Sequence, residues 1–313
     1  MALYVRPRPR LRRYVDTVMK DSFSTYHPSI NFIYFAFVIL VSIFLWHPVL
    51  LAISFAASMT YSIYLNGKRA VKFNLLALLP LMLAAAVLNP VFNHEGATIL
   101  LYVNDNPLTM EAVEFGIAAA VMLGTVILWF SCYNAIMTSD KFVYLFGRII
   151  PALSMILSMV LRFVPKYKAQ IKRVSAAQKC IGKGVGSGNW PARAKNGIAI
   201  LSVMMTWALE NAIDTADSMK SRGYGLKGRT AYSLYRFDAR DRTLLVVLAA
   251  LLVLVLGSMA MGGVSVRYYP TFRLNDMTIL SGVVYAAYAA VCFLPVLLDI
   301  KEDIVWRSLR SQI

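Results

Sequence analysis

An arginine followed by a glycine at a predicted helix end is the feature of this sequence with the clearest chemical use. The stretch from Ser202 to Gly225 reads SVMMTWALENAIDTADSMKSRGYG, and Gly223 is the residue type that ends a helix in a left-handed turn. Arg222 is then held at a fixed helix end, beside a residue that lets a partner's backbone approach closely. Lys220 and Arg222 also suit the helix end itself, since each gains about 0.3–1 kcal/mol from the negative end of the helix dipole. The residues alone leave both interpretations open.

The residue types that bind metals or act as nucleophiles are scattered along the chain. They are three cysteines and three histidines: Cys132, Cys180, Cys292, His27, His47 and His94. No two of them have the spacing of metal ligands, and an odd number of cysteines in apolar surroundings predicts buried thiols, not disulfides. We therefore expect no metal site and no enzymatic activity.

The glycine-rich stretch around Lys183 is similar to a phosphate-binding loop in composition only. Glycine alternates with other residues from Gly182 to Gly188, but neither serine nor threonine follows Lys183, and no strand is expected before it. We expect no cofactor bound by this chain and no ATP hydrolysis of its own. The stretch predicts a connector that leads to a helix beginning near Asn189 and Pro191.

The composition is that of an integral membrane protein. Hydrophobic residues make up 58% of the 313 residues and charged residues 15%, and the mean hydropathy is +0.60. Six apolar stretches predict membrane spans: 31–46, 48–65, 74–92, 114–133, 244–261 and 277–298. His47 and Pro48 predict a turn between the first two. The predicted fold class is an all-α integral membrane protein with about six transmembrane helices and a cytoplasmic domain of long amphipathic helices.

Basic residues are distributed very unequally between alternate segments. Of 32 Lys and Arg, six lie in 1–28, three in 66–73, eighteen in 139–242 and three after 300; only two lie in 263–276 and none in 94–112. This asymmetry predicts that the basic segments and both termini face the cytoplasm in a cell (inner) membrane. The net charge is +16, and its distribution indicates that the positive residues contact the lipid bilayer and not nucleic acid.

These patterns divide the chain into five parts. They are a basic cytoplasmic arm (1–28), four transmembrane helices with an external hairpin at 94–112 (29–137), a cytoplasmic helical domain (138–242), two more transmembrane helices (243–300) and a cytoplasmic tail (301–313). In the helical domain, Pro151 and Pro165 are predicted to break the helix at both ends of a short apolar run. A second, basic helix is predicted over 166–180.

A third predicted helix in this domain, around 202–222, is amphipathic. Leu201, Met205, Ala208, Ala212, Ala216 and Met219 share one stripe at steps of three and four residues. None of the six predicted spans carries a charged residue near its middle, which argues against a carrier driven by its own ion gradient. A large cytoplasmic helical domain attached to such a membrane region indicates that another protein supplies the energy for transport.

Four sequence elements in order carry a resemblance to a known family. They are Thr138-Ser139-Asp140, Leu161-Arg162-Phe163-Val164-Pro165, Ala177-Gln178 and Ala216-Asp217-Ser218-Met219-Lys220-Ser221-Arg222-Gly223. Together they resemble the transmembrane T component of energy-coupling-factor (ECF) transporters, the family that includes the cobalt-transport membrane subunits. The motif-bearing part covers about 138–225.

The resemblance implies a scaffold that joins two ABC-type ATPase subunits to a separate substrate-binding membrane subunit for uptake of a micronutrient, a vitamin or a metal ion. Two coupling helices, each ending in an Arg-Gly-type motif, would dock into the ATPases. By resemblance the coupling residues are Ala177, Gln178, Ile181, Gly182 and Lys183 on the first helix, and Ala216, Met219, Ser221, Arg222 and Gly223 on the second. Arg162 and Pro165 would form a structural motif.

The first motif departs from the family pattern. It reads Ala177-Gln178-Lys179-Cys180-Ile181-Gly182, with isoleucine where the family has arginine, and Lys179 or Lys183 is the candidate substitute. The alternative function is a self-contained channel or transporter whose cytoplasmic helices regulate it. An intramembrane enzyme is a weaker alternative, because the sequence shows no nucleophile or metal cluster within the spans.

Overall fold

The computed structural model describes residues 22–103, 106–147, 150–226, 235–260, 266–274 and 278–310. Most of the predicted basic arm and the turn at Asn104-Asp105 therefore lie outside the described residues. Contacts divide the chain into two units, Met1–Thr138 with Tyr235–Ile313 and Ser139–Leu234. We name the first the membrane unit and the second, after the coupling helices predicted in it, the coupling unit, and describe each by itself.

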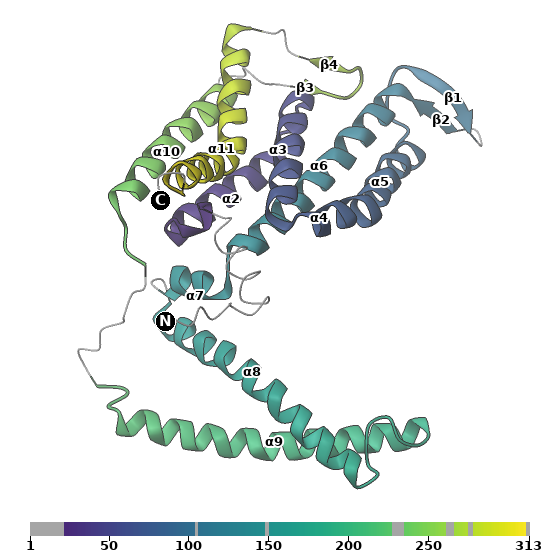
Figure 1. The fold of residues 1–313 in the computed structure, drawn as a ribbon. Coiled ribbons are helices and arrows are strands. Elements are labelled where there is room, and N and C mark those ends of the chain that lie inside the picture. Colours follow the sequence, from purple (N-terminus) through teal and green to yellow (C-terminus); the bar gives the residue numbers. More distant parts are fainter. Residues whose placement is uncertain are drawn as a thin grey trace. The chain divides into compact units, whose positions relative to one another are not determined.

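The membrane unit is a bundle of helices with two small hairpins (Figure 1). In chain order its elements are η1 (Phe23–Thr25), α2 (Pro28–Phe44), α3 (Pro48–Asn66), α4 (Lys68–Phe73), η2 (Asn74–Leu78), α5 (Leu79–Phe92), β1 (Ile99–Val103), β2 (Asn106–Thr109), α6 (Met110–Ile136), α10 (Ala239–Ala260), β3 (Val266–Arg267), β4 (Arg273–Leu274) and α11 (Ile279–Arg310).

The predicted all-α membrane fold is confirmed. Within the described ranges, five helical stretches are long and apolar enough to cross a membrane: Pro48–Asn66, Lys68–Phe92, Met110–Ile136, Ala239–Met259 and Ile279–Glu302. The remaining predicted span corresponds to α2, an apolar helix of 17 residues. The predicted turn is present, since α2 ends at Phe44 and α3 begins at Pro48, where a proline at the first helical position loses no hydrogen bond.

Aromatic side chains and small residues determine how these helices pack. Trp129 of α6 is fully buried against Tyr34 and Phe35 of α2, and its indole N–H donates to Ser54 Oγ of α3 at 2.9 Å. Ser54 Oγ is also 2.9 Å from Ser42 Oγ, so these buried hydroxyls satisfy each other in an apolar core. Gly116 lets α5 approach α6, because a Cβ there would lie 2.8 Å from the carbonyl oxygen of Ala86.

The hairpin predicted within 94–112 is present. β1 and β2 pair antiparallel, with Val103 opposite Asn106, and the Thr98 hydroxyl donates to Glu111 Oε1 at 2.8 Å. This bond ties the loop before β1 to the first turn of α6, where a carboxylate is favoured by the helix dipole. The location of the hairpin outside the cell stays a prediction.

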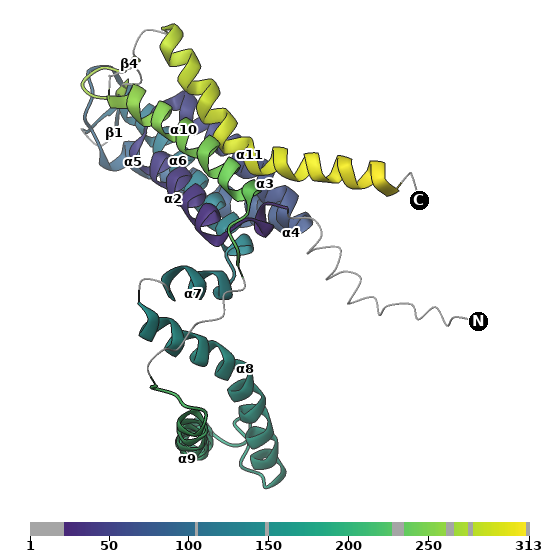
Figure 2. The same cartoon turned by 90° about the vertical axis from the view of Figure 1, so that its left-hand side faces the viewer.

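Two buried carboxylates hold the start of the described chain. Asp299 of α11 accepts hydrogen bonds from the backbone N–H groups of Ser22 (2.8 Å) and Phe23 (3.2 Å), and Asp241 of α10 accepts one from His27 N–H at 3.2 Å. Both side chains are at most 4% exposed. α11 continues through the predicted tail as far as Arg310, and Figure 2 shows it bent along its length, as a helix that contains Pro295 allows.

The coupling unit contains α7 (Ser139–Gly147), α8 (Pro151–Cys180) and α9 (Trp190–Ser221). Pro151 begins α8 as predicted, but the predicted break at Pro165 is wrong, because Pro165 lies inside a continuous helix of 30 residues. Directly after it, Lys166 and Tyr167 contact Trp207 of α9. These contacts favour continuation of the helix and oppose the cost of about 3 kcal/mol that an internal proline carries.

Candidate functional site

The two helices of the coupling unit end in the same backbone arrangement. Gly223 has φ of +78°, its N–H donates to the carbonyl of Lys220, and Tyr224 N–H donates to the carbonyl of Met219, both at 3.0 Å. These two bonds and the left-handed glycine form a Schellman cap, which satisfies carbonyls that the helix end would leave free. The Arg-Gly element is thus a defined structural motif.

α8 repeats this cap at the other predicted motif. Gly182 has φ of +76°, its N–H donates to Lys179 O at 3.1 Å, and Lys183 N–H donates to Gln178 O at 2.9 Å. Ile181 and Arg222 are therefore the C-cap residues of two matching helix ends. The two motifs therefore differ in the side chain at the C-cap position but have the same backbone conformation.

Both C-cap side chains face solvent. Ile181 is 63% exposed, and Arg222 is also exposed. No carboxylate in the part of the chain that the structure describes forms a salt bridge with Arg222. Arg222 can therefore offer its guanidinium to a carboxylate of another chain, and Ile181 can offer only apolar contact.

The other predicted coupling residues surround these caps. Ala177, Lys183, Ala216 and Ser221 are exposed, and Gln178 and Met219 are half-buried. The Ser221 hydroxyl donates to Ser218 O at 2.9 Å, which satisfies it within the helix. Arg162 and Pro165 lie on exposed positions of α8, where the Arg162 guanidinium is 6.0 Å from the centre of the Phe163 ring.

The structure places the two motifs at opposite ends of α9. The connector 181–189 joins the end of α8 to the start of α9, whereas Arg222 follows the last residue of α9. A helix of 32 residues spans about 48 Å at 1.5 Å per residue. One coupling unit therefore presents two similar helix ends far apart, which suits two separate contacts.

The connector is fastened to α9 by side chains. Asn196 Nδ2 donates to Gly184 O at 3.1 Å, and Arg193 Nε donates to Val185 O at 3.0 Å. Gly188 precedes the helix with φ of +91°, and Asn189 and Pro191 occupy the helix start, as predicted. These bonds fix how Ile181 and Lys183 are held relative to α9.

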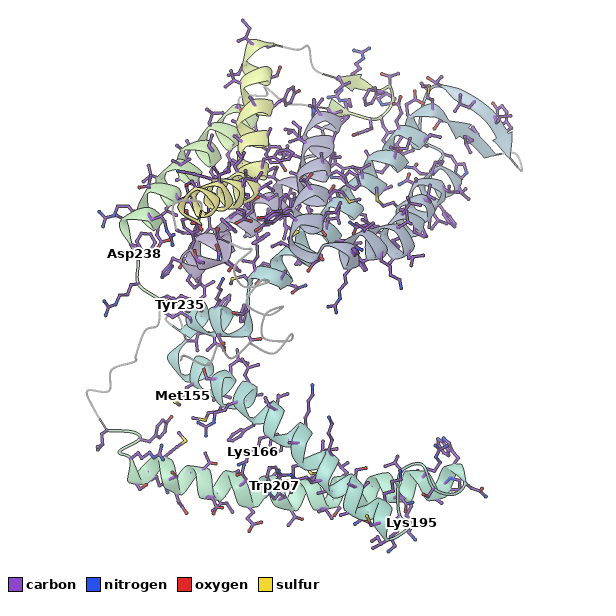
Figure 3. All side chains as sticks on the ribbon, in the orientation of Figure 1. Met155, Lys166, Lys195, Trp207, Tyr235 and Asp238 are labelled. Carbon is purple, nitrogen blue, oxygen red and sulfur yellow. The ribbon has the colours of Figure 1, made fainter. Side chains whose placement is uncertain are left out.

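A contact between α8 and α9 that sequence reasoning missed is centred on Lys166. Its Nζ donates to Asn211 Oδ1 at 2.6 Å and lies 5.5 Å from the centre of the Trp207 ring, which Tyr167 contacts edge-on at 5.4 Å. Figure 3 shows Lys166 and Trp207 side by side on the two helices. A tryptophan and an asparagine four residues apart on an amphipathic helix were the available signal.

The face of α9 that packs in the coupling unit is offset from the predicted apolar stripe by about one residue. Ile200 and Met204 are buried, while Leu201 and Met205 of the predicted stripe are 60% and 59% exposed. Leu209 and Ile213 extend this uncovered apolar surface. α9 therefore has apolar residues beyond those that its contact with α8 uses.

No group of three or more metal-ligating side chains lies close together among the residues described here. The exposed helix ends and the uncovered stripe of α9 are the surfaces of the coupling unit that could contact other molecules.

Comparison with known proteins agrees with this architecture. The family described as cobalt transport protein CbiQ matches residues 19–232. The chain is 39% identical over 100 residues to the energy-coupling factor transporter transmembrane protein EcfT of Listeria innocua, which is 32% of this chain and 38% of that protein. It is 34% identical over 105 residues to EcfT of Lactococcus lactis subsp. cremoris (33% and 40%) and 32% identical over 104 residues to EcfT of Staphylococcus aureus (33% and 39%).

These matches span about two fifths of the length of the curated relatives. The family match is broader, because it covers most of the membrane unit before α7 and nearly all of the coupling unit. The chain belongs to the CbiQ family of cobalt transport proteins and is a membrane component of the energy-coupling-factor transporter type.

Proposed function

We propose that this chain is the membrane scaffold subunit of an ECF-type ABC importer. In this proposal two ABC-type ATPase subunits bind the ends of α8 and α9, and their movement is passed to a separate membrane subunit that binds a micronutrient, a vitamin or a metal ion. The chain itself hydrolyses no ATP and binds no cofactor; ATP belongs to the partners.

The observation that carries the proposal is the pair of matching Schellman caps at Gly182 and Gly223. Each presents an exposed side chain, Ile181 or Arg222, at the end of a helix of at least 30 residues. A long helix is stiff, so a force applied at its capped end is delivered along its whole length. Two such ends lie toward opposite ends of a helix about 48 Å long, which suits two ATPase subunits.

The uncovered apolar stripe of α9 supports the second half of the proposal. Leu201, Met205, Leu209 and Ile213 are each 59–65% exposed, and an apolar surface of this kind marks a site of contact with another protein or with the membrane. A substrate-binding membrane subunit, itself apolar, is the partner we assign to this stripe.

Co-purification from the native membrane tests the proposal most directly. The tagged chain is expected to bring ATP-binding subunits with it, and ATP-driven substrate uptake in reconstituted vesicles is expected to require those subunits and a substrate-binding subunit. Ion-driven uptake by the chain alone would contradict the proposal and favour the self-contained transporter.

The proposal also requires both termini and the coupling unit to face the cytoplasm. Single cysteines at two exposed positions, Glu95 before β1 and Ser221 at the end of α9, report opposite sides. A membrane-impermeant thiol reagent applied to intact cells should label the cysteine at 95 and leave the one at 221 unlabelled. Labelling at 221 would overturn this topology.

A further inference from the structure

A groove in the membrane unit lies where the chain turns from α3 into α4. Gly67 separates the two helices with φ of +54°, and the chain changes direction there (Figure 1). The groove has a volume of about 590 Å³. Its walls include Ile63 from the last turn of α3, Val71 from α4, and Leu75 and Leu76 from η2. The groove is largely open, and its apolar residues Ile63, Val71, Leu75 and Leu76 are 38–65% exposed.

Two lysines line the same groove. Lys68 and Lys72 lie one helical turn apart on α4, and Arg69 lies beside Lys68 in the sequence. All three are exposed. No carboxylate is available nearby in the sequence, because residues 22–94 contain neither Asp nor Glu. Within the described residues none of the three cations forms a salt bridge.

The combination of an apolar groove and unpaired cations has a specific chemical match. We propose that this groove binds an anionic phospholipid, with an acyl chain against Val71, Leu75 and Leu76 and the phosphate near Lys68 and Lys72. The arrangement supports this, because the two lysines and Val71 on α4 and the two leucines on η2, a π-helical turn that directly follows α4, all line the same groove. Basic pockets at the ends of membrane helices are suited to anionic head groups.

The groove also lies at the correct level for a head group. Lys68 is the first residue of the apolar stretch Lys68–Phe92, so a membrane crossed by that stretch would bring its head groups to the level of this lysine. A soluble anion would gain nothing from the apolar wall, and a zwitterionic lipid would gain little from the positive charge. The proposal does not depend on the transport function.

Native mass spectrometry of the purified chain tests the site. Phosphatidylglycerol is compared with phosphatidylcholine of the same acyl chains, and the wild type is expected to bind phosphatidylglycerol more tightly. The double variant Lys68→Gln/Lys72→Gln should lose about tenfold or more in affinity for phosphatidylglycerol and change little toward phosphatidylcholine. The variant Leu75→Ser/Leu76→Ser should lower binding of both lipids, because it removes the apolar wall.

The matched control is Lys168→Gln/Lys172→Gln on α8. It removes two exposed lysines at the same spacing, outside the groove, and should leave phosphatidylglycerol binding unchanged. An equal loss in both double variants would reduce the effect to overall charge and overturn the site. Equally tight binding of glycerol phosphate, which has no acyl chain, would overturn the lipid as the ligand and indicate a free-anion site.

Discussion

Ile181 and Arg222 occupy the same position in two matching helix ends. Each is the C-cap residue directly before a left-handed glycine, and each cap has the same two backbone hydrogen bonds. The two ends therefore differ mainly in what they offer a partner: apolar contact at Ile181 and a guanidinium at Arg222. Comparing the two ends therefore separates the contribution of the charge to partner binding from that of the backbone.

The first prediction concerns the charge. If an ATPase subunit binds Arg222 through a carboxylate, as proposed, Arg222→Glu should abolish binding at that end, because the carboxylate would lose its partner, a loss of typically about 3–5 kcal/mol for a buried pair. Even a half-exposed pair would lower affinity by about tenfold or more. Quantitative pull-down of the ATPase subunits measures the effect. Lys220→Glu, with the same charge change on the same turn, is the control and should bind more nearly as wild type does.

Substitutions in the first motif, around Ile181, should affect ATPase binding differently from Arg222→Glu. Ile181→Ala should change ATPase binding little, and Lys183→Ala should have an intermediate effect if Lys183 substitutes for the missing arginine. Ile181→Arg should raise retention of the ATPase, because it places a guanidinium on a cap of the same geometry.

Equal retention of the ATPase by Arg222→Glu and wild type would leave Arg222 as a helix-end residue only.

The second prediction concerns the two capping glycines. Gly182→Ala and Gly223→Ala should each loosen the last helical turn, since a left-handed conformation costs a residue with a Cβ about 1–2 kcal/mol. The two substitutions should cost about the same, because a Cβ at Gly182 meets nothing within 4 Å and the Leu226 Cδ1 that lies 3.0 Å from a Cβ at Gly223 is the free end of an exposed side chain. Hydrogen exchange of the amides in the last turns of α8 and α9 measures the loss.

Gly186→Ala is the control for the caps. Gly186 lies in the same connector, its φ is not positive and a Cβ there meets open space. Equal exchange rates in Gly182→Ala and Gly186→Ala would contradict the requirement for a left-handed residue at the cap.

The third prediction concerns the contact between α8 and α9. Lys166→Met keeps most of the side-chain length but removes the 2.6 Å hydrogen bond to Asn211. Because Lys166 is exposed, the loss in stability of the coupling unit should be modest, about 0.5–1 kcal/mol. Trp207→Ala should cost more, since it removes the ring that both Lys166 and Tyr167 contact.

A double-mutant cycle of Lys166→Met and Asn211→Ala, read by chemical denaturation of the coupling unit in the full chain, isolates the pair. Lys168→Met, an exposed lysine of the same helix, is the control. Strictly additive effects of Lys166→Met and Asn211→Ala would show that the bond does not hold the helices together.

The fourth prediction concerns the buried carboxylate of Asp299. Asp299→Ala should destabilise the membrane unit by about 1–3 kcal/mol, because the backbone N–H groups of Ser22 and Phe23 would lose their acceptor in a buried place. Asp299→Asn keeps one acceptor oxygen and should lose less. Thermal unfolding in detergent measures both, with the exposed Asp238→Ala as the control. Identical unfolding temperatures for Asp299→Ala and wild type would contradict the role.

The sequence by itself determined the fold class, because the bilayer sets how long an apolar helix must be, and five of the six predicted spans reach that length in the described residues. It also determined the turn at Pro48, the hairpin before α6 and the glycine stop after Arg222, since these depend on local backbone preferences of proline, glycine and turn residues. Gly182 carried the same local signal at the end of α8. What the sequence could not show is that both caps have the same hydrogen bonds, so that Ile181 and Arg222 are equivalent.

Only the tertiary structure decided the continuity of α8 and the contact face of α9. Pro165 predicts a break because local preference counts the lost hydrogen bond alone, whereas the next turn gains contacts with Trp207 that lies 42 positions away in the chain. The stripe of Leu201 and Met205 marks apolar character correctly, but Ile200 and Met204 are the residues buried. Amphipathicity fixes which side of a helix is apolar, and the partner helix then selects which part of that side it covers.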